Sequence, residues 1–257
     1  FILSSEYTEE GVFMNGQCPG RSGFTAGRKP GATHLMSDKP EEKGMYYKGI
    51  GKLQIKDGWT EAKEDGIYCY DISEVLLTVA IQSSYNGSTK HPYVEGVNPD
   101  VKLAEDEKTL AKSYDELLRE HVEDYHAYFH RVSFSLESSG REDMDLQERL
   151  ELFAEDAQDQ SLIPLLFDYG RYLLISSSRP GTQPTNLQGI WNKDKVPAWF
   201  SDYTVNINTE MNYWPAPVCN LSELVEPLVR MNAELLESGR QTAKQFFGCE
   251  GSMCFHN

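Results

Sequence analysis

The sequence has 257 residues, of which 39% are hydrophobic and 25% charged, so the chain can form a packed core. Its net charge of −16, without a Lys/Arg cluster, argues against a nucleic-acid or anionic-membrane partner. No apolar run reaches the roughly 18 residues that a transmembrane helix requires. We therefore expect neither a nucleic-acid nor a membrane partner.

Residues 1–100 are expected to form strands joined by turns. "MYYKGIGKLQI" alternates between polar and apolar residues, and "EVLLTVAIQSSY" is an apolar run rich in Val and Ile. Between them lie two turn signals, Asp57-Gly58 and Asp65-Gly66. This part of the chain is predicted to be β structure.

The pattern becomes helical after about residue 100. "KSYDELLREHVEDYHAYF" repeats apolar residues at three- and four-residue steps, "RVSFSLE" then alternates as a short strand, and the acidic residues 141–160 indicate an exposed helix. Residues 161–176 predict a helix in which Gly170 indicates close packing. The final helix is expected after Asn220, with Pro227 marking its first turn. Strands before helices predict two parts with a boundary near residue 105.

Residues 178–204 form a long irregular stretch, "SRPGTQPTNLQGIWNKDKVPAWFSDYT", with three prolines and two tryptophans. A loop of this length in a compact domain is usually functional or disordered, and the aromatic residues argue against disorder. An indole ring can stack on a sugar ring. For each of Trp191, Trp199 and Trp214 taken alone, however, a place in the core is favoured.

The segment "TVNIN" contains a row of polar side chains if it is extended. Thr204, Asn206 and Asn208 would then share one face, and Val205 and Ile207 would face a core. Asn is a poor helix former and Val and Ile are stiff in helices, so the extended form is favoured. An amide oxygen can hold a water by its protons but cannot remove one, which requires a carboxylate. The alternative, favoured by these residues alone, is that both asparagines merely satisfy loop backbone groups.

The chain shows no G-x-S-x-G, G-x-G-x-x-G, P-loop or H-E-x-x-H motif. Its five cysteines include no C-x-x-C pair, which favours free, mostly buried thiols over a disulfide or metal site. Free thiols slightly favour a reducing, cytoplasmic location. The chain starts at Phe1 without Met, so we expect that both ends continue and that an upstream export signal is an alternative.

Two long segments resemble glycoside hydrolase family 95, the inverting α-L-fucosidases and related α-L-galactosidases. They are "YGRYLLISSSRPGTQPTNLQGIWN" and "SDYTVNINTEMNYWPAPVCNLSELVEPL", and the likeness extends back through "HVEDYHAYFHRVSFSL" and "KGMYYKGIGKL". It covers nearly the whole chain. The resemblance implies a mixed α and β fold, with part of a β-sandwich followed by a helical linker and the first helices of an (α/α)6 barrel. The implied ranges are 1–104, 105–160 and 161–257.

The same resemblance implies a mechanism and a set of site residues. Asn206 and Asn208 match the family's N-x-N pair, whose amide oxygens orient the water that attacks the sugar. The base Asp and acid Glu lie beyond Asn257 in the family, so this piece alone is expected to be inactive. No cofactor is implied, and the partner is a fucosylated or L-galactosylated glycan. The substrate contacts are expected to be Thr204, Trp199, His256 and Asn257.

Two departures from the family pattern affect the expected site. "FHN" at the end is similar to the start of the family's "HHNTD", with Phe255 in place of the first His. Thr204 stands where fucosidases of the family have His. A smaller hydroxyl side chain would leave room for the extra hydroxyl of L-galactose, so both sugars are candidates. The rival classes are a non-catalytic carbohydrate-binding protein and a glycoside phosphorylase, for which no phosphate site is evident.

Overall fold

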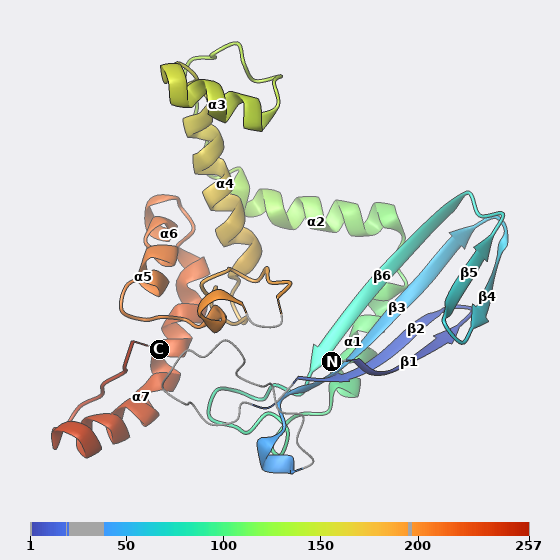
Figure 1. Cartoon of the computed structure of the whole chain (residues 1–257), viewed down its shortest axis with the longest axis horizontal. Helices are drawn as coiled ribbons and strands as arrows, with labels where there is room; N and C mark the ends of the chain where they lie inside the picture. Colours follow the sequence, from blue (N-terminus) through green and yellow to red (C-terminus); the bar gives the residue numbers. More distant parts are fainter. Residues whose placement is uncertain (1, 19, 21–38, 195–196, 257) are drawn as a thin grey trace. The chain divides into compact units, whose positions relative to one another are not determined.

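The computed structural model describes residues 2–18, 20, 39–194 and 197–256. The chain forms two compact units, Phe1–Arg119 and Glu120–Asn257. The first contains antiparallel sheets and a helix, and the second is helical (Figure 1). The prediction of a mixed α and β fold, with β structure first, is confirmed. Within the described ranges, no helix has the length and apolar character needed to cross a membrane.

The strands of the first unit form two antiparallel sheets. The larger has the order β1-β2-β3-β6, and β4 and β5 form a hairpin. Asp57 and Gly58 both have positive φ, 63° and 61°, as the tight turn after β3 requires. The predicted strands and turns are thus confirmed. The strands are β1 (Ile2–Thr8), β2 (Gly11–Gln17), β3 (Tyr46–Lys56), β4 (Trp59–Lys63), β5 (Gly66–Tyr70) and β6 (Glu74–Ser83).

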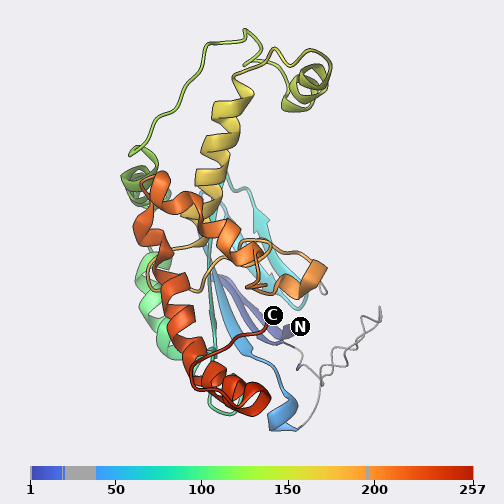
Figure 2. The same ribbon diagram turned by 90° about the vertical axis from the view of Figure 1, so that its left-hand side faces the viewer.

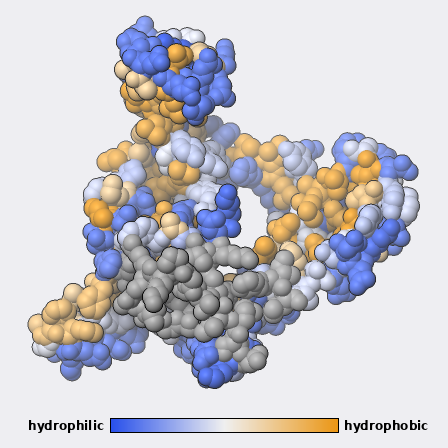
Figure 3. Space-filling view, viewed as in Figure 1, coloured by the Kyte–Doolittle hydropathy of each residue, from blue (hydrophilic) through white to orange (hydrophobic). Residues whose placement is uncertain are grey.

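One face of the larger sheet is covered by helix α1 (Pro99–Leu110). Thr78 Oγ1 donates to the Leu110 carbonyl at 3.2 Å, and Gln82 Nε2 donates to Asp106 at 2.7 Å. The alternate side chains of β6 point to the opposite face and are 53–58% exposed. Figure 3 shows apolar surface over this part of the unit. Such a contiguous patch is typical of a contact surface. Its β6 members are Val75, Leu77, Val79 and Ile81.

The helices of the second unit pack around a small core. Ile175, Leu221 and Leu224 are completely buried, and Tyr213 joins them. Pro227 lies in the first turn of α7, as predicted. The helices are α2 (Tyr114–Phe129), which begins in the first unit, α3 (Leu146–Asp156), α4 (Leu162–Ser177), α5 (Asn208–Tyr213), α6 (Pro215–Val218) and α7 (Glu226–Phe247). The described residues also form 3-10 turns, which are η1 (Pro40–Glu42) in the first unit and η2 (Ala198–Ser201) and η3 (Ser222–Val225) in the second.

Three local predictions are wrong. "RVSFSLE" forms no strand, and Phe134 instead packs edge-on against Phe167 of α4 with ring centroids 5.4 Å apart. A side chain at Gly170 would meet no described atom within 4 Å, so close packing does not explain this glycine. All five cysteines are free thiols, but only Cys219 is buried. Sequence periodicity does not reveal which neighbours cover a side chain.

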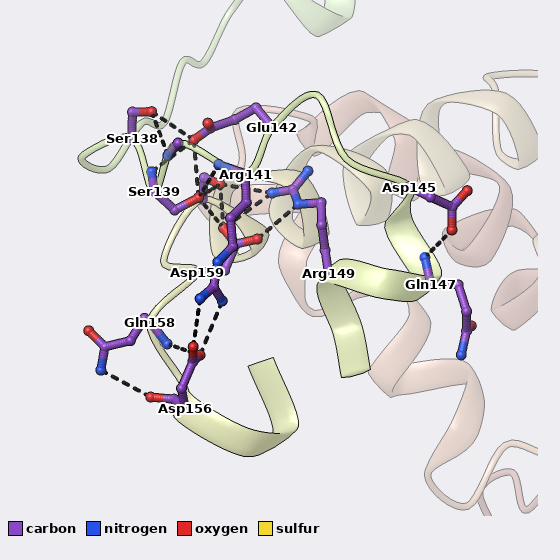
Figure 4. A network of polar contacts seen from close by, with 12 residues as sticks. Ser138, Ser139, Arg141, Glu142, Asp145, Gln147, Arg149, Asp156, Gln158 and Asp159 are labelled. Atoms are coloured by element: carbon purple, nitrogen blue, oxygen red, sulfur yellow. Dashed lines mark hydrogen bonds and ion pairs between the residues drawn. The ribbon is translucent and has the colours of Figure 1, made fainter. Parts of the chain in front are cut away.

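A polar network closes the segment around α3 (Figure 4). Arg149 Nε donates to Asp159 Oδ2 at 2.8 Å, and Arg149 Nη2 donates to Ser161 Oγ at 2.8 Å. Ser139 Oγ donates to Asp159 Oδ1 at 2.7 Å. The helix predicted within residues 141–160 is confirmed, but its exposure is not uniform, because Arg149 and Asp159 are both buried. Ser139 joins the two ends of the segment through Asp159, and Arg149 supplies the counter-charge of that carboxylate.

Candidate active site

A cavity of about 590 Å³ lies in the second unit, within the size range of small-molecule sites. Five of the residues predicted for the site line it: Thr204, Asn206, Asn208, Trp199 and His256. Asn257, the sixth, lies outside the described residues. The cavity is completed by Leu187, Gln188 and Ala198. Residues separated by up to 69 positions thus meet at one pocket.

The segment "TVNIN" is not extended, so that prediction is wrong. Val205–Ile207 form a turn and α5 begins at Asn208. The backbone bonds explain the turn: Thr209 N–H donates to the Thr204 carbonyl at 3.3 Å, and Val205 N–H donates to the His256 carbonyl at 2.7 Å. Ile207 is 40% exposed instead of facing a core. Thr204, Asn206 and Asn208 nevertheless share the pocket, because the turn brings them together.

The backbone leading into the pocket is strained. Trp199, Phe200, Ser201 and Thr204 have φ values of 54°, 58°, 54° and 40°, in the left-handed region that non-glycine residues rarely adopt. Each such residue costs on the order of 1–3 kcal/mol and persists only where its surroundings enforce it. Strain of this kind clusters at ligand sites, which supports a functional role for the pocket.

Gln188 helps to hold the backbone of residues 198–201 in this strained conformation. Its Nε2 donates to the Ala198 carbonyl at 3.2 Å, and its Oε1 accepts a hydrogen bond from Ser201. Its own N–H donates to Asn186 Oδ1 at 2.8 Å. Sequence reasoning missed Gln188 as a site residue. The one signal for it was its place in "TNLQGIWN", inside the long irregular stretch.

The tryptophans are not core residues, so that preference is wrong. Trp191, Trp199 and Trp214 are 44%, 54% and 61% exposed. Of these three, Trp199 is the one that lines the pocket. Its indole is therefore accessible for stacking on a ligand ring.

Thr204 has a buried hydroxyl that is unsatisfied within the described structure. The residue is 9% exposed, and its Oγ1 has no hydrogen-bond partner among the described residues. A buried polar atom without a partner is unfavourable unless a ligand or water completes it. Thr204 lines the pocket, so this unsatisfied hydroxyl belongs to a residue of the pocket wall.

A buried group of hydrogen bonds around the Tyr213 hydroxyl connects α5 to the loop that carries Leu187 and Gln188. Tyr213 Oη accepts from the Thr185 N–H at 2.9 Å and lies 2.8 Å from Ser178 Oγ, which donates to the Leu224 carbonyl at 2.9 Å. Burial raises the pKa of the Tyr213 hydroxyl. Asn212 Nδ2 also reaches the loop, donating to the Asn186 carbonyl at 3.2 Å. Asn212 thus has a structural partner.

Replacing Tyr213 by Phe is expected to lower the free energy of unfolding by about 1–3 kcal/mol, because the buried Thr185 N–H loses its acceptor. Thermal or urea unfolding of the full-length protein measures this loss. Tyr169→Phe is the matched control, since Tyr169 is 55% exposed on α4. Equal stability of the two variants would contradict the stabilising role of the hydrogen bonds around the Tyr213 hydroxyl.

The lining combines an indole, three amides, an imidazole and a hydroxyl, with no Asp or Glu among its described residues. Within the same part of the chain, no group of three or more His, Cys, Asp or Glu side chains could hold a metal ion. Aromatic and neutral polar groups of this kind suit a sugar ring, which offers C–H faces and hydroxyls. The pocket therefore has the character of a carbohydrate site.

Comparison with known proteins agrees with a carbohydrate site. Residues 113–257 match the glycosyl hydrolase family 95 catalytic domain. The chain is 35% identical over 249 residues to "Alpha-L-fucosidase 2" of Arabidopsis thaliana, covering 93% of the chain and 29% of that protein. It is 39% identical over 191 residues to "Probable alpha-fucosidase A" of Aspergillus niger, covering 72% of the chain and 24% of the relative. The chain belongs to glycosyl hydrolase family 95 and spans less than a third of these relatives.

Proposed function

We propose that the chain is part of an inverting exo-glycosidase that releases terminal α-L-fucosyl or α-L-galactosyl residues from glycans. The observation that carries this proposal is the gathering of Asn206, Asn208, Thr204, Trp199 and His256 around one cavity. Family membership and the names of the relatives support it. The pocket requires no cofactor for this chemistry.

In the proposed architecture, residues 1–104 belong to a β-sandwich, 105–160 to a helical linker and 161–257 to the start of an (α/α)6 barrel. The uncovered apolar face of β6 is what one sheet of a sandwich presents to the other. The helices α4, α5, α6 and α7 lie in the same unit as the pocket, which Asn208 of α5 lines. They would form the catalytic part.

Inversion needs a water on the face of the sugar opposite the leaving group. The amide oxygens of Asn206 and Asn208 would accept hydrogen bonds from this water and direct its lone pair at the anomeric carbon. An Asp removes the water proton and a Glu protonates the leaving oxygen, both supplied from beyond residue 257. Trp199 would stack on the sugar, and His256 and Asn257 would bind its hydroxyls.

Residues 1–257 alone are expected to release no sugar, because neither carboxylate is present to move a proton. The full-length protein is expected to release L-fucose or L-galactose from nitrophenyl glycosides. Release by residues 1–257 would contradict the assignment of the carboxylates. If the full-length protein binds these sugars without hydrolysing them, it is a carbohydrate-binding protein instead.

Thr204 is proposed to shift the preference of the enzyme towards L-galactosides, with L-fucosides as the alternative substrate. Its unpaired, buried hydroxyl would bond the additional hydroxyl of L-galactose, which L-fucose lacks. Thr204→His in the full-length enzyme is expected to lower the ratio of kcat/KM for the galactoside to that for the fucoside by about 10-fold or more. The two nitrophenyl glycosides are compared in competition. A large fucoside preference in the unsubstituted enzyme would overturn this assignment.

A further inference from the structure

Gly239 lies on α7 where the chain runs back along the helix after Phe247 (Figures 1 and 2). A Cβ at this position would lie 2.2 Å from Ser252 Oγ, 3.1 Å from the Met253 carbonyl oxygen and 3.2 Å from the Met253 nitrogen. The first separation is shorter than van der Waals contact allows, and the other two are tight, so the neighbouring atoms would have to shift. The returning segment therefore packs directly on the bare helix backbone.

The returning residues Ser252–His256, here called the strap, are anchored at both ends. Met253 N–H donates to the Gly239 carbonyl at 3.0 Å, and three residues later the His256 carbonyl accepts from the Val205 N–H at 2.7 Å. Val205 lies between Thr204 and Asn206, which both line the pocket together with His256. The strap thus connects the middle of α7 to the wall of the pocket.

We propose that Gly239 is a positioning residue: by lacking a side chain, it sets how closely the strap approaches α7 and so places His256 in the pocket. The effect on catalysis rests on the proposed function, whereas the effect on the strap does not. Alanine strengthens a helix relative to glycine, so a helix alone would favour Ala here. The close approach of Ser252 and Met253 is the reason that this position favours glycine.

The test replaces Gly239 by Ala in the full-length protein, with Gly170→Ala as the matched control. Both substitutions put alanine inside a helix, but a Cβ at Gly170 meets no described atom within 4 Å. Gly239→Ala is expected to speed hydrogen exchange at the Met253 and Val205 amides about 10-fold and to lower kcat/KM about 10-fold. The control is expected to change neither. Unchanged exchange at both amides in Gly239→Ala would overturn the proposal, whether or not the protein hydrolyses glycosides.

A double-mutant cycle separates positioning from a general loss of structure. In a His256→Ala background, Gly239→Ala is expected to lower kcat/KM less than it does alone, because the group that it displaces is already absent. Fully additive losses would overturn the role through His256. If Gly239→Ala folds poorly, Ser252→Gly is added to the same variant to remove the 2.2 Å contact. The double variant is expected to regain exchange protection at the Met253 and Val205 amides, and failure to do so counts against the proposal.

Discussion

Replacing Asn206 or Asn208 by Ala in the full-length enzyme is expected to lower kcat by about 10²–10³-fold with little change in KM. Both side chains line the pocket and neither can exchange a proton. Their proposed role is to hold the attacking water, and that water forms its bond to the sugar only in the transition state. An interaction used in the transition state appears in kcat, whereas uniform substrate binding appears in KM.

Asn232→Ala is the control for this experiment, because Asn232 is an exposed residue of α7 that does not line the pocket. It is expected to leave kcat and KM unchanged. The two parameters are measured with a nitrophenyl α-L-glycoside. A raised KM at unchanged kcat for the Asn206 and Asn208 variants would show that these amides bind the sugar and do not orient the water.

The sequence predicts the regular elements well because their signals are local. The alternation along β3, the apolar run of β6 and the repeats of α2 and α4 depend on near neighbours in the chain. The turn at Val205–Ile207 depends instead on a hydrogen bond to His256, 51 positions away, which no local pattern reveals. The buried Arg149–Asp159 pair likewise lay within a run of charges that resembled a solvated face.

The site shows the same limit. From the residues alone, Asn206 and Asn208 were better explained as loop residues, and the extended conformation proposed to group them is wrong. A resemblance to a known family instead named residues that the structure brings to one pocket, because such a resemblance carries information about distant contacts. It still did not indicate Gln188, whose importance lies in bonds to Ala198 and Ser201 across the loop.

Replacing Asp159 by Asn is expected to lower the melting temperature of the second unit by about 5 °C or more. Arg149 would remain buried without its counter-charge, since Asp159 is fully buried and its two oxygens accept bonds from Arg149, Ser139 and Ser161. Removing one partner of a buried ion pair lowers the stability more than replacing both partners, because it leaves an uncompensated buried charge. Hydrogen exchange along α3 is expected to quicken at the same time.

The network also predicts acid sensitivity. Hydrogen bonding to Arg149 lowers the pKa of Asp159, and backbone N–H groups of Glu142 itself and of Ser139 lower the pKa of Glu142 to about 2 (Figure 4). In the unfolded chain these carboxyl groups have pKa values of about 4, so below that pH the unfolded chain binds protons that the folded state does not. The stabilisation is therefore complete above about pH 4.5 and is lost as the pH falls towards about 2.

Asp159→Asn removes one of these two titrating groups, so the stability of this variant is expected to fall less steeply between about pH 4.5 and 2 than that of the unsubstituted protein. Thermal unfolding at several pH values measures both slopes. Asp143→Asn, an exposed carboxylate in the same segment, is the matched control and is expected to leave the slope unchanged. Parallel slopes for all three proteins would mean that the buried pair is not the source of the acid sensitivity. A shallower slope for Asp159→Asn alone would assign a share of that sensitivity to the buried Arg149–Asp159 pair.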